Sequence, residues 1–343
     1  KVIQAGFKGI IKNEFGYTNV RGIDLLREQI LYKIKNFYEI STAIDKNIIS
    51  TAGAKHGLYC IFQSIINPGD EVVIFAPYWP SYPEMIKTFG GKVKVFDISN
   101  LNSKSIFKFE KLLTSKTKAV VFNSPSNPGG YLLAEEYYFS LVLSSLKNSN
   151  AFILHDNVYE HLSWSPKNIK FPFSKLDSKD ISRNIIVNSV SKSCSMTGWR
   201  VGFVFASHDL IKILTAINSQ SISNIPVVAQ YAAIYALKNE SKIAKEICDE
   251  LRENSKTLSI ALNNINNVNF VEPEAGMFCF VNFSSYIKKN NFKNDTDFAY
   301  YLLNKFGLVT VPGIFFGKKN FLRISFGVSK SVLTRIIKIL KKL

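Results

Sequence analysis

The stretch 189–204, SVSKSCSMTGWRVGFV, places one lysine among serines, follows it with an arginine and ends in an apolar run. One interpretation is a strand end, a polar turn and a second strand. In the other, Lys192 is a covalent anchor, and Ser189 and Arg200 hold an anion beside it. A lysine that attacks a carbonyl carbon must first lose its proton, so it needs burial or a nearby cation to lower its pKa. A surface lysine is the ordinary case, and Lys192 by itself does not decide between the two.

The regions around this stretch alternate between strand and helix patterns. Short β-branched or aromatic runs predict buried strands at 71–77, 92–97, 118–125, 151–159, 184–189 and 201–207. Longer amphipathic segments predict helices at 53–66, 81–89 and 134–148. Such alternation indicates an α/β fold with a mostly parallel sheet flanked by helices on both faces. Ligands bind such sheets at the carboxyl ends of the strands, where most of the polar clusters fall.

The pattern changes in the last third of the chain. Residues 224–264 are almost continuously helical in pattern, and after Pro273 short strands and helices at 296–305 and 329–342 follow. We therefore expect a large cofactor-binding domain at 15–265. A smaller α+β domain is expected at 266–343, together with 1–14.

Composition limits the classes of function. The net charge of +17 is spread along the whole chain, which favours a basic solvated surface over nucleic-acid binding. No apolar run is long enough to cross a bilayer, and no signal-peptide pattern opens the chain. The four cysteines and four histidines show no metal-ligand spacing, so we expect reduced thiols, no metal and a cytoplasmic location. Because the first residue is not Met, we expect an N-terminal segment to be missing, which can include an organellar targeting signal.

The neighbours of Lys192 suggest a phosphate site. Ser189 supplies a hydroxyl, and Arg200 supplies a planar fork of donors suited to phosphate. The segment 51–57, TAGAKHG, places glycines and alanines at a predicted helix start, whose free N–H groups favour anions. A glycine-rich helix start is often only a cap. Together with a reactive lysine, however, these groups suggest a phosphorylated carbonyl cofactor, and pyridoxal 5'-phosphate (PLP) is the obvious candidate.

Other strand ends offer what the remaining parts of PLP need. Asp156, in HDNVYE, can pair with the protonated pyridine nitrogen; Asn127, in NSPSNPGG, and Tyr159 can donate to the phenolate oxygen. Trp79, in APYWPSYPE, can stack on the ring. Each has a structural alternative, because Asp156 can cap a helix, Asn127 can form a turn and Trp79 can belong to the core. Their joint occurrence favours the cofactor site.

At this point the sequence resembles the class I/II aminotransferases of fold type I, from about residue 15 to the C-terminus. The motif around Lys192 matches throughout, and PGDEVVIFAPYWPSYPEM, NSPSNPGG, HDNVYEHL and FLRISFG occur in the family's order. The branch that it resembles most is the bacterial-type aspartate aminotransferase, some members of which also act on prephenate. The family's fold has a large PLP-binding domain and a smaller α+β domain.

The resemblance implies a role for each matched residue. Lys192 would form the internal aldimine and move the proton, and Asp156 would pair with the pyridinium. Tyr159 and Asn127 would bind the phenolate oxygen, and Trp79 would stack on the ring. The phosphate would be held by the following residues: Gly53, Ala54, Ser189 and Arg200, with Tyr17 from the partner subunit of a homodimer.

Substrate groups follow from the same resemblance. Arg323, in FLRISFG, would bind the α-carboxylate, and Asn127 and Trp79 would adjoin the substrate. Lys55 would contact the distal carboxylate of an acidic substrate, although it can equally be a second phosphate contact or a solvated side chain. The sequence departs from the family pattern at Gly129, Asn157 and His56, and Arg21 stands where a small residue is common.

We therefore predict a PLP-dependent aminotransferase. It would exchange an amino group between aspartate or glutamate and a 2-oxo acid, by a ping-pong mechanism. Two alternatives remain at this point. One is another PLP enzyme of the same fold, a β-lyase or a synthase. The other is an aminotransferase-like regulatory domain, which the net positive charge would suit.

Overall fold

A computed structural model describes residues 1–11, 16–98, 101–165 and 171–343. Its main sheet has seven strands in the order β1-β7-β6-β5-β4-β2-β3. Their bounds are β1 Ile48–Thr51, β2 Glu71–Ala76, β3 Lys92–Asp97, β4 Thr117–Phe122, β5 Phe152–Asp156, β6 Asn184–Ser189 and β7 Gly202–Phe205. Strands β6, β5, β4, β2 and β3 pair in parallel, and β1 and β7 join at one edge as antiparallel strands. The predicted α/β fold with a mostly parallel sheet is confirmed.

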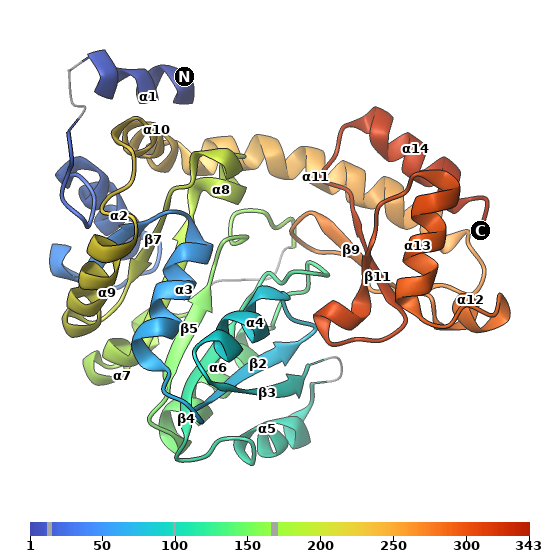
Figure 1. The fold of residues 1–343 in the computed structure, drawn as a ribbon, viewed down its shortest axis with the longest axis horizontal. Helices are drawn as coiled ribbons and strands as arrows, with labels where there is room; N and C mark the ends of the chain where they lie inside the picture. The colour runs from blue at the N-terminus through green and yellow to red at the C-terminus, as the bar shows by residue number, and fades with distance from the viewer. Residues whose placement is uncertain (12–15, 99–100, 166–170) are drawn as a thin grey trace.

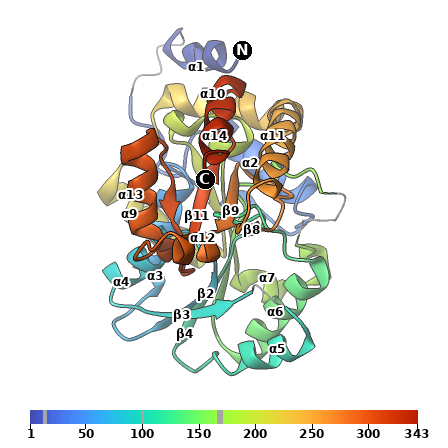
Figure 2. The ribbon, with the colours of Figure 1, turned by 90° about the vertical axis from the view of Figure 1, so that its right-hand side faces the viewer.

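Helices cover both faces of this sheet (Figure 2). One side carries α3 Ala54–Ile65, α4 Ser81–Thr88 and α9 His208–Ser221, and the other carries α5 Ser103–Glu110, α6 Glu135–Asn148 and α7 Ser178–Arg183. The strands alternate between the two cores: Val120 and Phe122 of β4 pack on one side, and Val121 packs on the other. Burial on both faces explains why these strands are continuous apolar runs and do not alternate with polar residues.

The C-terminal part forms a second, antiparallel sheet. Its strands run in the order β10-β11-β9-β8, with β8 Asn269–Phe270, β9 Phe278–Asn282, β10 Val311–Pro312 and β11 Phe321–Ser325. Around it lie α12 Ser284–Lys289, α13 Asp295–Phe306 and α14 Lys330–Leu340 (Figure 1). This sheet has its own core, which includes Leu251 and Leu258 of the long helix α11 Glu240–Asn263. Helix α11 therefore belongs partly to the packing of the small sheet.

Three further helices lie at the edge of the main sheet that carries β1 and β7 (Figure 1). They are α1 Val2–Ile11, α2 Asp24–Asn36 and α10 Val227–Lys238. Helix α1 packs on α10 so closely that a Cβ atom at Gly9 would lie 2.7 Å from the ring of Tyr231. Residues 1–11 thus contact the chain range predicted for the large domain, and the division into domains stays a prediction. Within the described ranges, no helix combines the length and apolar character needed to cross a membrane.

Candidate active site

A cavity of about 430 Å³ opens at the carboxyl ends of the main strands. Asp156 ends β5 and Ser189 ends β6, while the small sheet contributes Phe278 and Arg323. Ten of the sequence-predicted residues line it: Ala54, Lys55, Trp79, Asn127, Asp156, Tyr159, Ser189, Lys192, Arg200 and Arg323. Gly53 adjoins it, since a Cβ atom there would lie 2.5 Å from Nη2 of Arg200. The expectation that strand ends bring these residues together therefore agrees with the geometry.

Lys192 lies on α8, the single helical turn Val190–Ser193 that follows β6. Burial lowers the pKa of its ammonium group, and the positive charges of Arg323 and Arg200 lower it further, whereas Asp156 opposes the shift. The ammonium nitrogen lies 5.9 Å from the ring centre of Tyr159. A lysine amine acts as a nucleophile or general base only in its neutral form, and a lowered pKa favours that form.

Asp156 is a buried carboxylate with one unused oxygen. Its Oδ2 accepts a hydrogen bond of 2.5 Å from the hydroxyl of Tyr82, whereas Oδ1 is buried and has no hydrogen-bond partner among the described residues. Burial raises the pKa of Asp156 to about 6, against the opposing effects of Tyr82, the Val158 N–H group and Lys192. Because a buried acceptor without a donor is costly, Oδ1 fits a ligand that brings an N–H donor or a positive charge.

Arg200 and the start of α3 form a cationic end of the cavity. Arg200 adopts a left-handed backbone conformation with φ of 55°, and its guanidinium donates to the carbonyl oxygens of Thr197 and Ala52 at 3.0 and 3.1 Å. Arg200 has no carboxylate partner in the parts of the chain that the structure describes. A Cβ atom at Gly202 would lie 2.6 Å from the backbone nitrogen of Ala54, so only glycine lets β7 approach this helix start. Exposed donors and a helix N-terminus together suit a phosphate group.

Arg323 and Asn127 meet across the cavity. Nη1 of Arg323 donates to Oδ1 of Asn127 at 2.9 Å, and the guanidinium carbon lies 4.1 Å from the ring centre of Phe278. This packing leaves further guanidinium donors of Arg323 available to a carboxylate. Burial also raises the pKa of Tyr159, so its hydroxyl stays a neutral donor.

Lys55 and Tyr17, two further predicted residues, lie in different places. Lys55 lines the cavity, and its ammonium nitrogen lies 4.9 Å from the ring centre of Trp79. Tyr17 is 92 % exposed and is not part of the cavity lining of its own chain. Its predicted action on a partner subunit stays a prediction.

Sequence reasoning missed Tyr82 and Asn123. Tyr82 binds the Asp156 carboxylate, while Asn123 donates from Nδ2 to the backbone oxygen of Asp156 at 2.9 Å and accepts from the Asn127 N–H at 3.0 Å. Their positions carry a partial signal, because Tyr82 follows Trp79 by one helical turn and Asn123 follows β4 directly. A buried tyrosine at helical spacing is otherwise indistinguishable from a core residue.

The fold and this cavity define an α/β enzyme with a reactive lysine, a nearby buried carboxylate and an anion site. Comparisons with known proteins identify the family. The model of the family "Aminotransferase class I and II" matches residues 1–340. An aspartate aminotransferase of Bacillus subtilis is 34% identical over 99% of this chain and 86% of its own length. A protein of Aquifex aeolicus named "Probable aspartate/prephenate aminotransferase" is 35% identical with the same coverage.

Solved structures agree with these relatives. The aspartate aminotransferase from Rhizobium meliloti superposes with a TM-score of 0.90 at 28% identity, and covers 99% of this chain and 86% of that chain. An aspartate aminotransferase from Thermotoga maritima gives 0.86 at 32% identity, with coverages of 99% and 87%. The chain belongs to the class I and II aminotransferases and catalyses transamination. The predicted aminotransferase thus stands over the alternatives of a β-lyase, a synthase or a regulatory domain.

Proposed function

We propose that this enzyme uses PLP to exchange an amino group between an acidic amino acid, aspartate or glutamate, and a 2-oxo acid. The observation that carries the proposal is the meeting of three groups in one cavity. These are the Lys192 amine with its lowered pKa, the unpartnered Oδ1 of Asp156 and the exposed guanidinium of Arg200. An aldehyde carbon, a pyridine nitrogen and a phosphate require such groups.

The residues of the cavity fit PLP part by part. Oδ1 of Asp156 would accept the N–H of the protonated pyridine, which resolves its missing hydrogen bond. Asn127 and Tyr159 would donate to the phenolate oxygen, and Trp79 would cover the ring face. The phosphate would be bound by Gly53, Ala54, Ser189 and Arg200. When bound, PLP supplies an aldehyde carbon and a ring that accepts electrons from the substrate Cα.

The protein's own groups would then bind the substrate and move one proton. Arg323 would hold the α-carboxylate through the guanidinium donors that Asn127 does not occupy. Nζ of Lys192, once neutral, would take the Cα proton and deliver it to C4′, the former aldehyde carbon of the cofactor. Donor and acceptor would use the same cavity in turn, as ping-pong exchange requires.

Lys55 supports the choice of acidic substrates. It is exposed at the cavity and has no carboxylate partner among the described residues. Two cations, Lys55 and Arg323, suit a substrate with two carboxylates. One structural neighbour, an aspartate aminotransferase of Thermus thermophilus with a TM-score of 0.89 at 26% identity, was solved with the dicarboxylate maleate.

The proposal extends to assembly and location. A homodimer with shared active sites is supported by the exposed Tyr17 and by the exposed apolar side chains of Ile3, Phe7 and Ile11 on α1. A cytoplasmic location is supported by four cysteines that are all free thiols.

The test combines a chemical trap with an activity assay. With PLP, aspartate and 2-oxoglutarate, the native chain should form oxaloacetate, and borohydride should fix the cofactor covalently to Lys192. Lys192→Ala should lose both, because the amine that binds the aldehyde and moves the proton is gone. The matched control is Lys212→Ala, which removes an exposed lysine of α9 and should change neither. A Lys192→Ala enzyme that still turns over and still retains cofactor after borohydride would overturn the assignment.

A further inference from the structure

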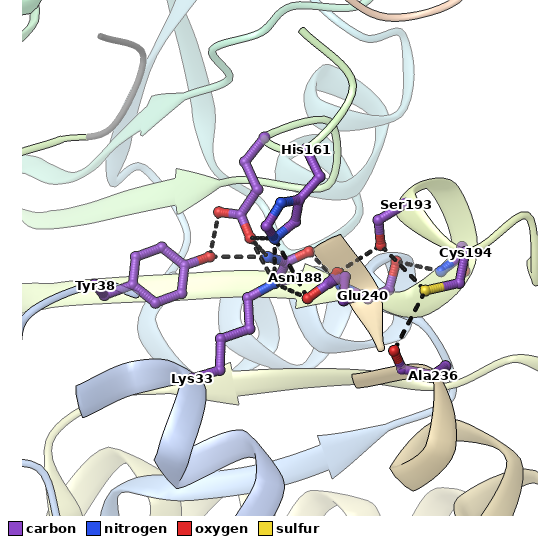
Figure 3. Close-up of polar contacts among 11 residues, drawn as sticks. Lys33, Tyr38, His161, Asn188, Ser193, Cys194, Ala236 and Glu240 are labelled. Atoms are coloured by element: carbon purple, nitrogen blue, oxygen red, sulfur yellow. Dashed lines mark hydrogen bonds and ion pairs between the residues drawn. The ribbon is translucent and has the colours of Figure 1, made fainter. Parts of the chain in front are cut away.

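A second group of charged and polar side chains, outside the cavity lining, contains Lys33 and Glu240 (Figure 3). Nζ of Lys33, on α2, contacts Oε1 of Glu160 at 2.6 Å and Oε2 of Glu240 at 2.5 Å. All three side chains are less than 10% exposed: 7% for Lys33, 8% for Glu160 and 6% for Glu240. Around them lie His161, Tyr38, Asn188 and Ser193, and we call these seven residues the Lys33 cluster. The two carboxylates raise the pKa of Lys33 despite its burial, so its ammonium group stays charged.

Three members of the Lys33 cluster adjoin cavity residues in the sequence: Glu160, Asn188 and Ser193. Tyr159 lines the cavity, while the next residue, Glu160, accepts hydrogen bonds from Tyr38 at 2.5 Å and Asn188 at 2.7 Å. Asn188 precedes Ser189, and its Oδ1 accepts the Ser189 N–H at 2.7 Å. The turns that carry the cavity residues are therefore anchored on their opposite side by one ionic group.

Lys192 has the most direct anchor. Ser193, the next residue of the single-turn helix α8, donates from Oγ to Oε1 of Glu240 at 2.6 Å (Figure 3). Glu240 is the first residue of α11, and its other oxygen is held by Lys33. A helix of one turn has little stability of its own, so the position of Lys192 depends on such contacts.

The same helix α11 also holds the small sheet. Nδ2 of Asn254 donates to the backbone oxygens of Phe326 and Val328 at 3.0 Å each. These residues directly follow β11, which carries Arg323. Helix α11 thus contacts the turn of Lys192 through its first residue, Glu240. Further along the same helix, Asn254 contacts the segment that follows the strand of Arg323.

We propose that the hydrogen bond from Ser193 to Glu240 is a positioning contact that fixes the Lys192 amine relative to Arg323 through α11. This inference rests on the proposed function, because it assumes that Lys192 and Arg323 act on one substrate. Neither Ser193 nor Glu240 lines the cavity, so their effect on the reaction is indirect. A misplacement of a reacting group by about 1 Å can lower a rate roughly a hundredfold.

Loss of this contact should change the environment of Lys192. The charged and titratable groups that face its amine are the following: Arg323 from β11, Arg200 from the segment before β7, Asp156 at the end of β5, and Tyr159 after it. When Ser193 no longer holds the turn, Lys192 gains water and moves away from the two arginines. Both changes favour the ammonium form and raise the pKa toward its ordinary value.

The experiment compares Ser193→Ala with Ser193→Thr, which restores the hydroxyl, and with Ser145→Ala. Ser145 is a matched control because it is buried and its Oγ donates to a backbone oxygen inside α6 at 2.7 Å. The first readout is the pKa of Lys192 in the apoprotein, obtained from the pH dependence of its acetylation by acetic anhydride and mass spectrometry. The second is kcat and KM of the PLP-loaded enzyme with aspartate.

Ser193→Ala should raise the Lys192 pKa by about one unit and lower kcat about tenfold, with KM within roughly twofold. Ser193→Thr and Ser145→Ala should keep the native pKa. Equal Lys192 pKa values in Ser193→Ala and Ser145→Ala would overturn the positioning role. If the native enzyme catalyses no transamination but Ser193→Ala still shifts the pKa, the proposed function fails while the positioning contact is supported.

Discussion

Replacing Asp156 by asparagine should stabilise the apoprotein while it disables the loaded enzyme. Asparagine has nearly the same shape, and its Oδ1 can still accept the Tyr82 hydrogen bond that Asp156 Oδ2 now accepts at 2.5 Å. Its uncharged amide removes the buried negative charge whose pKa is raised to about 6 by burial. Because the folded-state pKa lies above the ordinary value of 3.8, ionisation of Asp156 costs stability above that pH.

The magnitude follows from the two pKa values. The unfolded chain ionises near pH 3.8 and the folded apoprotein near pH 6, so the penalty grows as the pH rises between these values and is complete above pH 6. Each pKa unit corresponds to about 1.4 kcal/mol, which gives roughly 3 kcal/mol at pH 8 and about half of that at pH 5. Below pH 3.8 the carboxyl group is neutral in both states and the difference disappears.

The assay is urea unfolding of apoprotein, native and Asp156→Asn, at pH 8 and pH 5. Asp156→Asn should be the more stable form at both pH values, with the larger gain at pH 8. In the loaded enzyme the same change removes the anion proposed to pair with the ring nitrogen, and kcat/KM with aspartate should fall at least about a hundredfold. An apoprotein that is destabilised by Asp156→Asn at pH 8, or a stability difference that does not change with pH, would refute the reasoning.

Two further predictions concern substrate choice and assembly. Lys55→Met should lower kcat/KM for aspartate by about tenfold to a hundredfold. For alanine, which has no second carboxylate, kcat/KM should fall less than about threefold. Equal decreases in kcat/KM for the two amino acids would show that Lys55 does not contact the second carboxylate. Tyr17→Phe should bind PLP more weakly than the native chain. Mixing Tyr17→Phe chains with inactive Lys192→Ala chains should give more activity than the two separate preparations. In a mixed dimer, one site combines an intact Lys192 with an intact Tyr17 from the other chain. Activity that merely averages on mixing would place Tyr17 outside the partner's site.

The strands of the main sheet could be predicted because both of their faces are buried. The six predicted runs correspond to β2 through β7, although several of the predicted ranges were longer than the strands. Strand β1, with the sequence IIST, has only two apolar residues and did not stand out as an apolar run. The antiparallel direction of β7 follows from its connection to β6, which contains only α8 and a short turn and lacks the helix that a parallel crossover needs.

The cavity residues could be predicted where a chemically distinctive residue type lies at or just after a strand end. Asp156 ends β5 and Lys192 follows the end of β6, whereas Arg200 was found from its spacing to Lys192 and lies before β7. The supporting contacts were not predictable, since they join residues far apart in sequence. Tyr82 and Asp156 are 74 residues apart, and Lys33 and Glu240 are 207 residues apart. A lysine in the pattern of α2 is typical of a solvated helix face, and only the fold shows that Lys33 is buried.

The contacts of Arg21 also could not be predicted from the sequence. The sequence places it close to Tyr17, at a position where the family commonly has a small residue. In the structure its guanidinium binds the carboxylate of Asp45 and the backbone oxygen of the same residue, at 2.8 Å each. Arg27 also contacts Asp45 at 2.7 Å. This local ion-pair network accounts for Arg21 without a substrate.

The electrostatics of the cavity explain why one site suits both cofactor and substrate. Its lining contains four cationic side chains, Lys55, Lys192, Arg200 and Arg323, and one carboxylate, Asp156. Positive side chains therefore outnumber negative ones in the lining, and Arg323 and Arg200 add to the effect of burial in lowering the pKa of Lys192. A phosphate, a pyridinium and two carboxylates complement these charges group by group. Because a ligand that binds only the folded state stabilises it by mass action, PLP and a dicarboxylate should each raise the unfolding temperature, and the gain from PLP should shrink in Asp156→Asn.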